Sequence, residues 1–146
     1  MIFLKETNEI KDVCVTEEDT KLFSYTNYDF LVEEIKTQIE EKISNKTNYG
    51  DLGYNDVNNP YGLKLSSIAF KYSNPRIIEN KLYLDLKILD TPKGKFMSSL
   101  ISDFDNSKLF RTVLTGIGTL EEDKSISDYK LITVNFVWKN ETLPLS

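Results

Sequence analysis

The side chains that could carry chemistry in this chain are hydroxyls, carboxylates and lysines, because histidine is absent. Histidine is the side chain whose ordinary pKa lies nearest neutral pH, so its absence excludes Ser-His and Cys-His catalysis and every histidine-ligated metal site. Cys14 is the only cysteine, which excludes an internal disulfide and fits a reducing compartment. Nucleophilic catalysis would therefore need a hydroxyl activated by a lysine or a carboxylate.

Four hydroxyl side chains are candidate nucleophiles, namely Ser66, Ser67, Thr112 and Thr115. Lys64 and Lys71 lie close to the two serines in the sequence, so a Ser-Lys dyad is one arrangement that would activate a serine. The favoured interpretation is that these hydroxyls belong to strands and turns.

Two groups of acidic residues could hold a cation. The first comprises Asp51, Asp56 and Asp90, which lack the spacing of a calcium loop. Asp90 is instead expected to shape the turn before Pro92. The second is the segment SDFDNS at 102–107, which lacks the downstream glutamate of a calcium loop. We therefore expect neither a metal nor a cofactor.

Two helices are expected to position these groups. The first covers residues 27–44, because apolar residues recur every four positions and Phe30 widens their stripe: Leu31, Ile35, Ile39 and Ile43. Asn27 or Asp29 is expected to cap its start. Pro92 suits the first turn of the second helix, which continues through residues 95–104.

Strands are expected between and around the helices. The clearest is KLYLDLKIL at 81–89, whose leucines alternate with polar residues. Others are expected at 2–4, 13–15, 63–72, 109–120 and 129–138, whereas 47–62 reads as a loop and 74–80 as a turn. This order predicts a single α+β domain over 1–146, with a mostly antiparallel sheet or small β-barrel flanked by two or more helices.

Charge and hydropathy limit the partners. The net charge is −5 and no run of basic residues occurs, so nucleic acid is not an expected partner. The start of the chain lacks the pattern of a secretory signal, and no apolar stretch approaches the roughly 20 residues that span a bilayer. A membrane association is therefore not expected either.

Five segments follow the first helix in an order that resembles a known family: GDLGYN, LSSIAF, KLYLDLKILDTPKGK, TGIGTL and DYKLITVNFV. The resemblance is to the prohead (capsid maturation) serine proteases of tailed bacteriophages, distant relatives of the herpesvirus assemblin proteases. In that family a helix leads into Gly-Glu-Leu-x-His-Pro, and a Ser-His pair lies on the next strand. A strand ending in Ile-Leu-Asp-Thr-Pro-x-Gly, a helix, Gly-x-Ser-Ser-Arg-Gly-x-Gly-x-Leu and a strand like Asp-Phe-Glu-Leu-x-x-x-Asp-x-Val follow.

The resemblance covers roughly residues 28–138. ILDTPKG at 88–94 matches outright, and GIGTL at 116–120 and the strand at 128–137 match in part. It implies an assemblin-like fold.

The departures fall on the residues that carry the family's chemistry. Tyr54 and Phe70 stand where the family has its two histidines, Val113 and Leu114 where it has two serines, and Thr115 where it has arginine. A tyrosine with an ordinary pKa of about 10 is a poor base at neutral pH. Phe70, Val113 and Leu114 have no proton to transfer, and we expect them in the core.

Three hypotheses follow. The first is a non-catalytic phage virion or capsid-assembly protein, present in the virion or in the host cytoplasm during assembly. Its partners would be phage capsid, portal or tail proteins, and the sequence leaves its oligomeric state open. The second is an active maturation protease with a non-standard nucleophile and base. The third is an unrelated small interaction protein.

Overall fold

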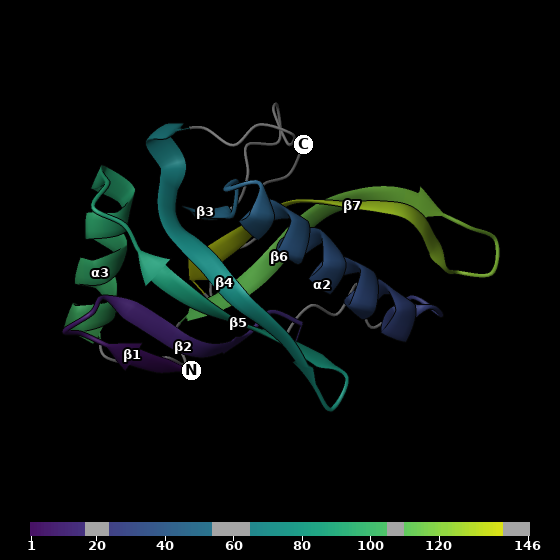
Figure 1. Cartoon of the computed structure of the whole chain (residues 1–146), viewed down its shortest axis with the longest axis horizontal. Helices are drawn as coiled ribbons and strands as arrows, with labels where there is room; N and C mark the ends of the chain where they lie inside the picture. Colours follow the sequence, from purple (N-terminus) through teal and green to yellow (C-terminus); the bar gives the residue numbers. More distant parts are fainter. Residues whose placement is uncertain (17–23, 54–64, 105–109, 139–146) are drawn as a thin grey trace.

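The computed structural model describes residues 1–16, 24–53, 65–104 and 110–138 (Figure 1). In chain order its elements are β1 (Ile2–Leu4), β2 (Glu9–Cys14), α2 (Tyr28–Ser44), β3 (Tyr49–Leu52), the 3₁₀-helix η1 (Leu65–Ser67), β4 (Ile68–Ile78), β5 (Lys81–Ile88), α3 (Pro92–Phe104), β6 (Phe110–Leu120) and β7 (Ile126–Trp138).

One seven-stranded sheet has the order β1-β2-β5-β4-β3-β7-β6. Its strand pairs are antiparallel except β3 with β7, which run parallel. The predicted α+β class and mostly antiparallel sheet are confirmed. Within the described residues no pairing joins β1 to β6, so the sheet is open and the barrel alternative is wrong.

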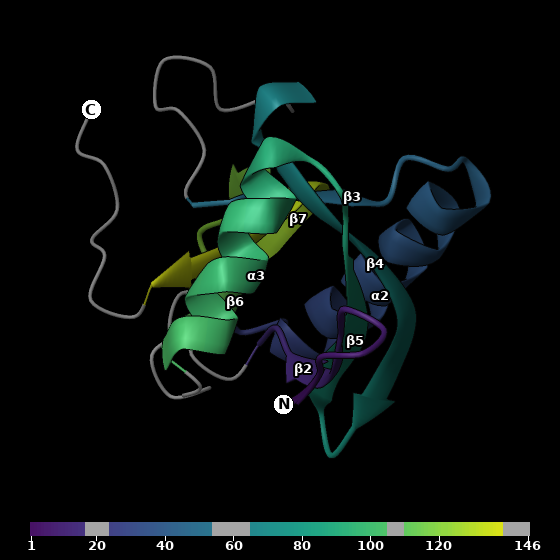
Figure 2. The ribbon, with the colours of Figure 1, turned by 90° about the vertical axis from the view of Figure 1, so that its left-hand side faces the viewer.

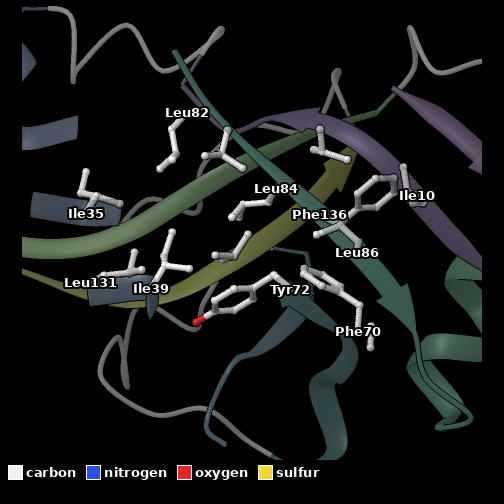
Figure 3. Close-up of a cluster of buried hydrophobic side chains, with 14 of the residues drawn as sticks. Ile10, Ile35, Ile39, Phe70, Tyr72, Leu82, Leu84, Leu86, Leu131 and Phe136 are labelled. Carbon is white, nitrogen blue, oxygen red and sulfur yellow. The ribbon is translucent and has the colours of Figure 1, made fainter. Parts of the chain in front are cut away.

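The core lies between the curved sheet and the two helices. The predicted alternation in β5 is confirmed, because Leu82, Leu84, Leu86 and Ile88 are all buried. They pack in one cluster with apolar residues of α2 and with Met97 of α3 (Figure 3). Figure 2 shows α3 and α2 apart from each other. Helix α3 packs against β3, β4 and β5, whereas α2 packs against β4, β5 and β7.

Helix α2 begins at Tyr28, one residue after the expected start, and the hydrogen bonds at its start differ from those expected. Asn27 occupies the N-cap position without a side-chain capping bond. Its amide instead donates to the carbonyl of Ile126 at 2.8 Å and accepts from the N–H of Ile126 at 3.0 Å. Phe30 is 64% exposed, so the expectation that it widens the buried stripe is wrong. The buried face consists of Leu31, Val32, Ile35 and Ile39.

Two predictions of irregular structure are wrong. Residues 49–52, expected in a loop, form β3 in the middle of the sheet. Residues 74–78, expected in a turn, continue β4, with the ladder interrupted between Ser73 and Arg76. Pro75 is tolerated there because a bulge does not require its missing N–H. In both places pairing with neighbouring strands outweighs the local preference of Gly, Asn and Pro for turns.

Asp85 of β5 binds the irregular segments of its two neighbouring strands, at Asp12 in β2 and at Asn74 in β4. Its carboxylate accepts hydrogen bonds from the backbone N–H of Asp12 at 3.1 Å and the amide of Asn74 at 3.0 Å. Arg76 and Lys11 lie 3.3 and 3.7 Å from it. Burial opposes ionisation of Asp85, but these hydrogen bonds and charges outweigh it and hold its pKa below the ordinary value.

The junction of β5 and α3 explains the segment ILDTPKG. The Thr91 hydroxyl accepts a hydrogen bond from the N–H of Gly94 at 2.9 Å and donates to the Ile68 carbonyl at 2.6 Å. Pro92 is the first residue of α3, as predicted. A Cβ at position 94 would lie 2.0 Å from the Leu89 carbonyl oxygen. The motif is therefore explained by helix capping and close backbone packing, without any catalytic role.

We predict that Gly94→Ala lowers the free energy of unfolding by about 3 kcal/mol, the upper end of the usual cost of overpacking, because the atoms that it meets are backbone atoms. Urea denaturation measures the effect. Ser99→Ala, at an exposed position of the same helix, is the control and should change stability by less than about 0.5 kcal/mol. Equal effects of the two substitutions would contradict this account of the motif.

Candidate functional site

The positions at which the family has catalytic residues are spread across the sheet. Phe70 lies on β4, and Val113 and Leu114 lie on β6, with β3 and β7 between them. At roughly 4.8 Å per strand, the path along the sheet from Phe70 to the β6 positions is about 14 Å. Tyr54 lies outside the described residues, so its assignment to a histidine position of the family stays a prediction.

The three described positions differ in burial. Phe70 is fully buried, as expected for a core residue. Leu114 is half-buried and packs against the core. Val113 is half-buried and is paired with Asn135, on the other face of the sheet from Leu114. The expectation that all three are core residues is therefore confirmed for Phe70 and wrong for Val113.

The ring of Phe70 occupies space that only glycine leaves open. Phe70 pairs with Gly50 of β3, and a Cβ at position 50 would lie 2.1 Å from its ring atom Cε2. The same Cβ would lie 2.8 Å from the Val134 carbonyl oxygen on β7. Figure 3 shows the ring among the buried side chains of the core. Position 70 is therefore occupied by a side chain that packs in the core.

The opposite face at this point of the sheet carries a row of polar side chains. Asp51 pairs with Asn135 across β3 and β7, and Asn135 pairs with Val113 across β7 and β6. Residues directly opposite each other share a face, so these side chains are neighbours. Thr115, two residues beyond Val113, is on the same face and donates to Asn135 Oδ1 at 2.5 Å.

Asn135 holds the row together. Its side chain is fully buried, and its Nδ2 donates to the carbonyl of Gly53 at 2.9 Å. It therefore fixes the end of β3 against β6 through a single amide. A buried amide costs free energy unless it is hydrogen-bonded, and these two bonds satisfy part of that requirement.

Asp51 is the ionisable member of the row. It is 5% exposed, and this burial raises its pKa above the ordinary value, while a hydrogen bond from the Ser67 side chain opposes the rise. Its Oδ1 has no hydrogen-bond partner among the described residues. A carboxylate next to a hydroxyl can accept the hydroxyl's proton, so Ser67 and Asp51 have the elements of nucleophilic chemistry. The carboxylate of this pair is buried, unlike those of the exposed serine–carboxylate pairs at the turn between β6 and β7.

The other candidates take different places. Lys71 lies over the ring of Tyr49, 5.2 Å from its centroid, and Lys64 lies outside the described residues, so a Ser-Lys dyad gains no support. Asp90 is exposed and 3.4 Å from Lys95, whereas Asp56 is not described. The described residues contain no group of three acidic or cysteine side chains suited to a metal ion. No helix in the described part is long and apolar enough to cross a membrane.

The roles of Asn135 and Asp51 were not predicted. One signal was present in the closing strand, where the family pattern has an aspartate at the position of Asn135. Another was a polar residue inside the apolar run of TVNFV, since central strands rarely bury an amide without a partner. Asp51 was considered only as a cation ligand, and its place on a central strand was missed because its segment was assigned to a loop.

No family model matches the sequence, and a search of curated proteins finds no match. Among solved structures, the bacteriophage T4 capsid assembly protease gp21 resembles this chain with a TM-score of 0.57 and 17% identity. The match covers 74% of this chain and 67% of gp21. The chain has a fold like that of a phage capsid assembly protease. At this identity the likeness concerns the protease-like fold alone.

We predict that Asp51→Asn stabilises the protein by about 1 kcal/mol at neutral pH, because asparagine retains the shape without a buried charge. A raised pKa in the folded state means that stability is highest below the unfolded pKa and is lost as pH rises through the folded pKa. The gain should therefore vanish toward about pH 3, as urea denaturation across the pH range will measure.

Asp85→Asn is the matched control, because its carboxylate has the opposite shift. The lowered pKa of Asp85 stabilises the fold above the unfolded pKa, and this contribution is lost as pH falls through the folded pKa. The variant should lose about 2 kcal/mol at neutral pH and approach the wild type in acid. If both variants were destabilised equally at neutral pH, the conclusion that the buried charge of Asp51 destabilises the fold would be wrong.

Proposed function

We propose that this protein is a non-catalytic phage virion or capsid-assembly protein built on a prohead-protease-like fold. The observation that carries the proposal is the combination of that fold with a chain that contains no histidine. A protease of this kind needs a base to activate its serine. The motif resemblance aligns Phe70, which is packed into the core, with one histidine of the family, and Val113 and Leu114 with its serines.

The rate of hydrolysis expected without the catalytic side chains favours a role in binding over a role in catalysis. An enzyme of this class without its catalytic side chains retains only about 10³–10⁴-fold acceleration over water, from substrate binding and the oxyanion hole. Capsid maturation requires cleavage of many copies of a structural protein, for which this residual rate is too small. The surfaces that bind capsid proteins do not depend on the nucleophile, and they would persist after its loss.

The proposed partners are therefore other phage structural proteins, in the capsid, the portal or the tail. The protein would act in the virion or in the host cytoplasm during assembly. The surface used by substrates in an active protease is the first place to look for such a partner, because extended peptides bind to sheet edges through backbone hydrogen bonds.

Quantitative mass spectrometry of purified mature particles tests this role. We expect the intact chain in the particles, with many copies if it decorates the capsid and about a dozen or fewer if it lies at the portal or tail. An assembly factor would be present in immature particles and absent from mature ones. Absence from both kinds of particle would contradict the proposal.

The hydrogen bond between Ser67 and Asp51 favours a second candidate, an active protease with a different nucleophile. In that mechanism Ser67 Oγ attacks a peptide carbonyl while Asp51 accepts its proton, and Asp51 then protonates the leaving amine. The raised pKa of Asp51 suits a group that both accepts and donates a proton.

A fluorophosphonate probe separates the two candidates, because it labels only an activated serine. We expect no labelling above that of the unfolded protein. Labelling that is lost in Ser67→Ala but retained in Ser66→Ala, the adjacent exposed serine, would establish the second candidate.

A further inference from the structure

Strand β6 is the long outer strand of the sheet. It covers Phe110–Leu120 and, within the described residues, pairs only with β7. The opposite outer strand, β1, has three residues. The outer edge of a strand presents unpaired N–H and C=O groups that can pair with another chain. An edge of this length therefore requires either protection or a partner.

The protein covers the part of β7 that extends beyond its pairing with β3, but in the described residues no such contacts are seen along β6. Along β7, the Gln38 amide donates to the Tyr129 carbonyl and accepts from the Leu131 N–H, both at 2.7 Å. Asn27 binds Ile126 in the same way. Two side-chain amides of α2 and its cap thus take the place of a neighbouring strand.

Among the described residues, the part of β6 from residue 112 to residue 120 carries none of the usual protective devices. Residues 112–120 contain no charge and no proline. Both irregularities in its pairing with β7 place the additional residue on β7, since Thr115 and Gly116 oppose Thr133 and Leu131. Ile117 and Leu120 are 40% and 64% exposed. A long, uncharged and apolar edge is a strand-pairing surface.

The charges at the two ends of β6 favour a second copy of this chain as the partner and an antiparallel direction of the two strands. The charges on or beside this strand are Lys108 and Arg111 at its start and Glu121, Glu122, Asp123 and Lys124 after its end, so its start is basic and its end carries a net negative charge. A second copy that pairs antiparallel about a two-fold axis brings the basic end of each strand against the acidic end of the other. Centred on Gly116, this pairing sets Arg111 opposite Glu121 of the second copy, and Ile117 opposite Thr115.

We propose that β6 is a homodimer interface, in which two copies join their sheets antiparallel across a two-fold axis. Such an interface is isologous, so the same strand contributes to both sides and the assembly closes at two copies. Parallel pairing is disfavoured because it sets like charges side by side.

Sedimentation equilibrium of the full chain tests the proposal. The wild type should reach twice the chain mass of 16.9 kDa within the micromolar range. Ile117→Lys and Ile117→Glu should each raise the dimer dissociation constant about tenfold or more, because the two substituted side chains lie diagonally across the axis, about 7–8 Å apart. Ile78→Lys, at a 51% exposed position of the β4–β5 hairpin, should leave it unchanged.

The decisive arm mixes the two variants. Ile117→Lys and Ile117→Glu, each weakened alone, should recover a one-to-one heterodimer when combined, because their charges then attract. Circular dichroism establishes that each variant is folded. A monomeric wild type, failure of the mixture to associate, or equal disruption by Ile78→Lys would overturn the proposal. A monomer that binds extended peptides along β6 would overturn it too, by assigning the edge to another kind of partner.

Discussion

The contact between Phe70 and Gly50 is the constraint on which the sheet depends. The four residues of β3 are the link between two parts of the sheet, β1-β2-β5-β4 on one side and β7-β6 on the other. At this link the ring of Phe70 lies over Gly50, and the backbone of Val134 approaches from the other side. A side chain at position 50 would have to displace one part of the sheet or the other. The continuity of the sheet therefore requires a glycine here.

The same contact bears on the proposed loss of catalysis. A histidine at position 70 would need a partner for its nitrogens, whereas a phenyl ring needs only apolar neighbours. The polar groups that remain lie on the other face, where Asn135 joins Gly53 to Thr115 and Ser67 binds Asp51. These bonds satisfy backbone and side-chain groups of the link. These polar contacts are therefore explained by their contribution to the stability of β3 between its two neighbouring strands.

Sequence reasoning succeeded where one local signal dominated. The alternating leucines of β5 and the four-residue apolar repeat of α2 each predict an element, because burial on one face fixes the period. Motif order predicted a prohead-protease-like fold, and the likeness to the T4 enzyme supports that prediction. Pro92 placed the start of α3, because proline suits the first helical turn.

The failures share one physical cause, which is pairing between residues distant in the chain. Gly50 and Asp51 have turn propensity, yet β4 and β7 on either side make them a strand. Asn27 would cap an isolated helix, but its amide binds Ile126, 99 positions away. The buried polar row could not be predicted for the same reason, since its members come from separate segments and meet only through the sheet.

The central claim is that packing has replaced catalysis on a protease-like fold, and hydrolysis is its most direct test. Purified protein should be incubated with phage capsid and scaffold proteins, and their intact masses followed over time. The account predicts that every substrate mass stays unchanged, with and without the protein. Specific cleavage products that appear with the wild type and are absent with Ser67→Ala would contradict it.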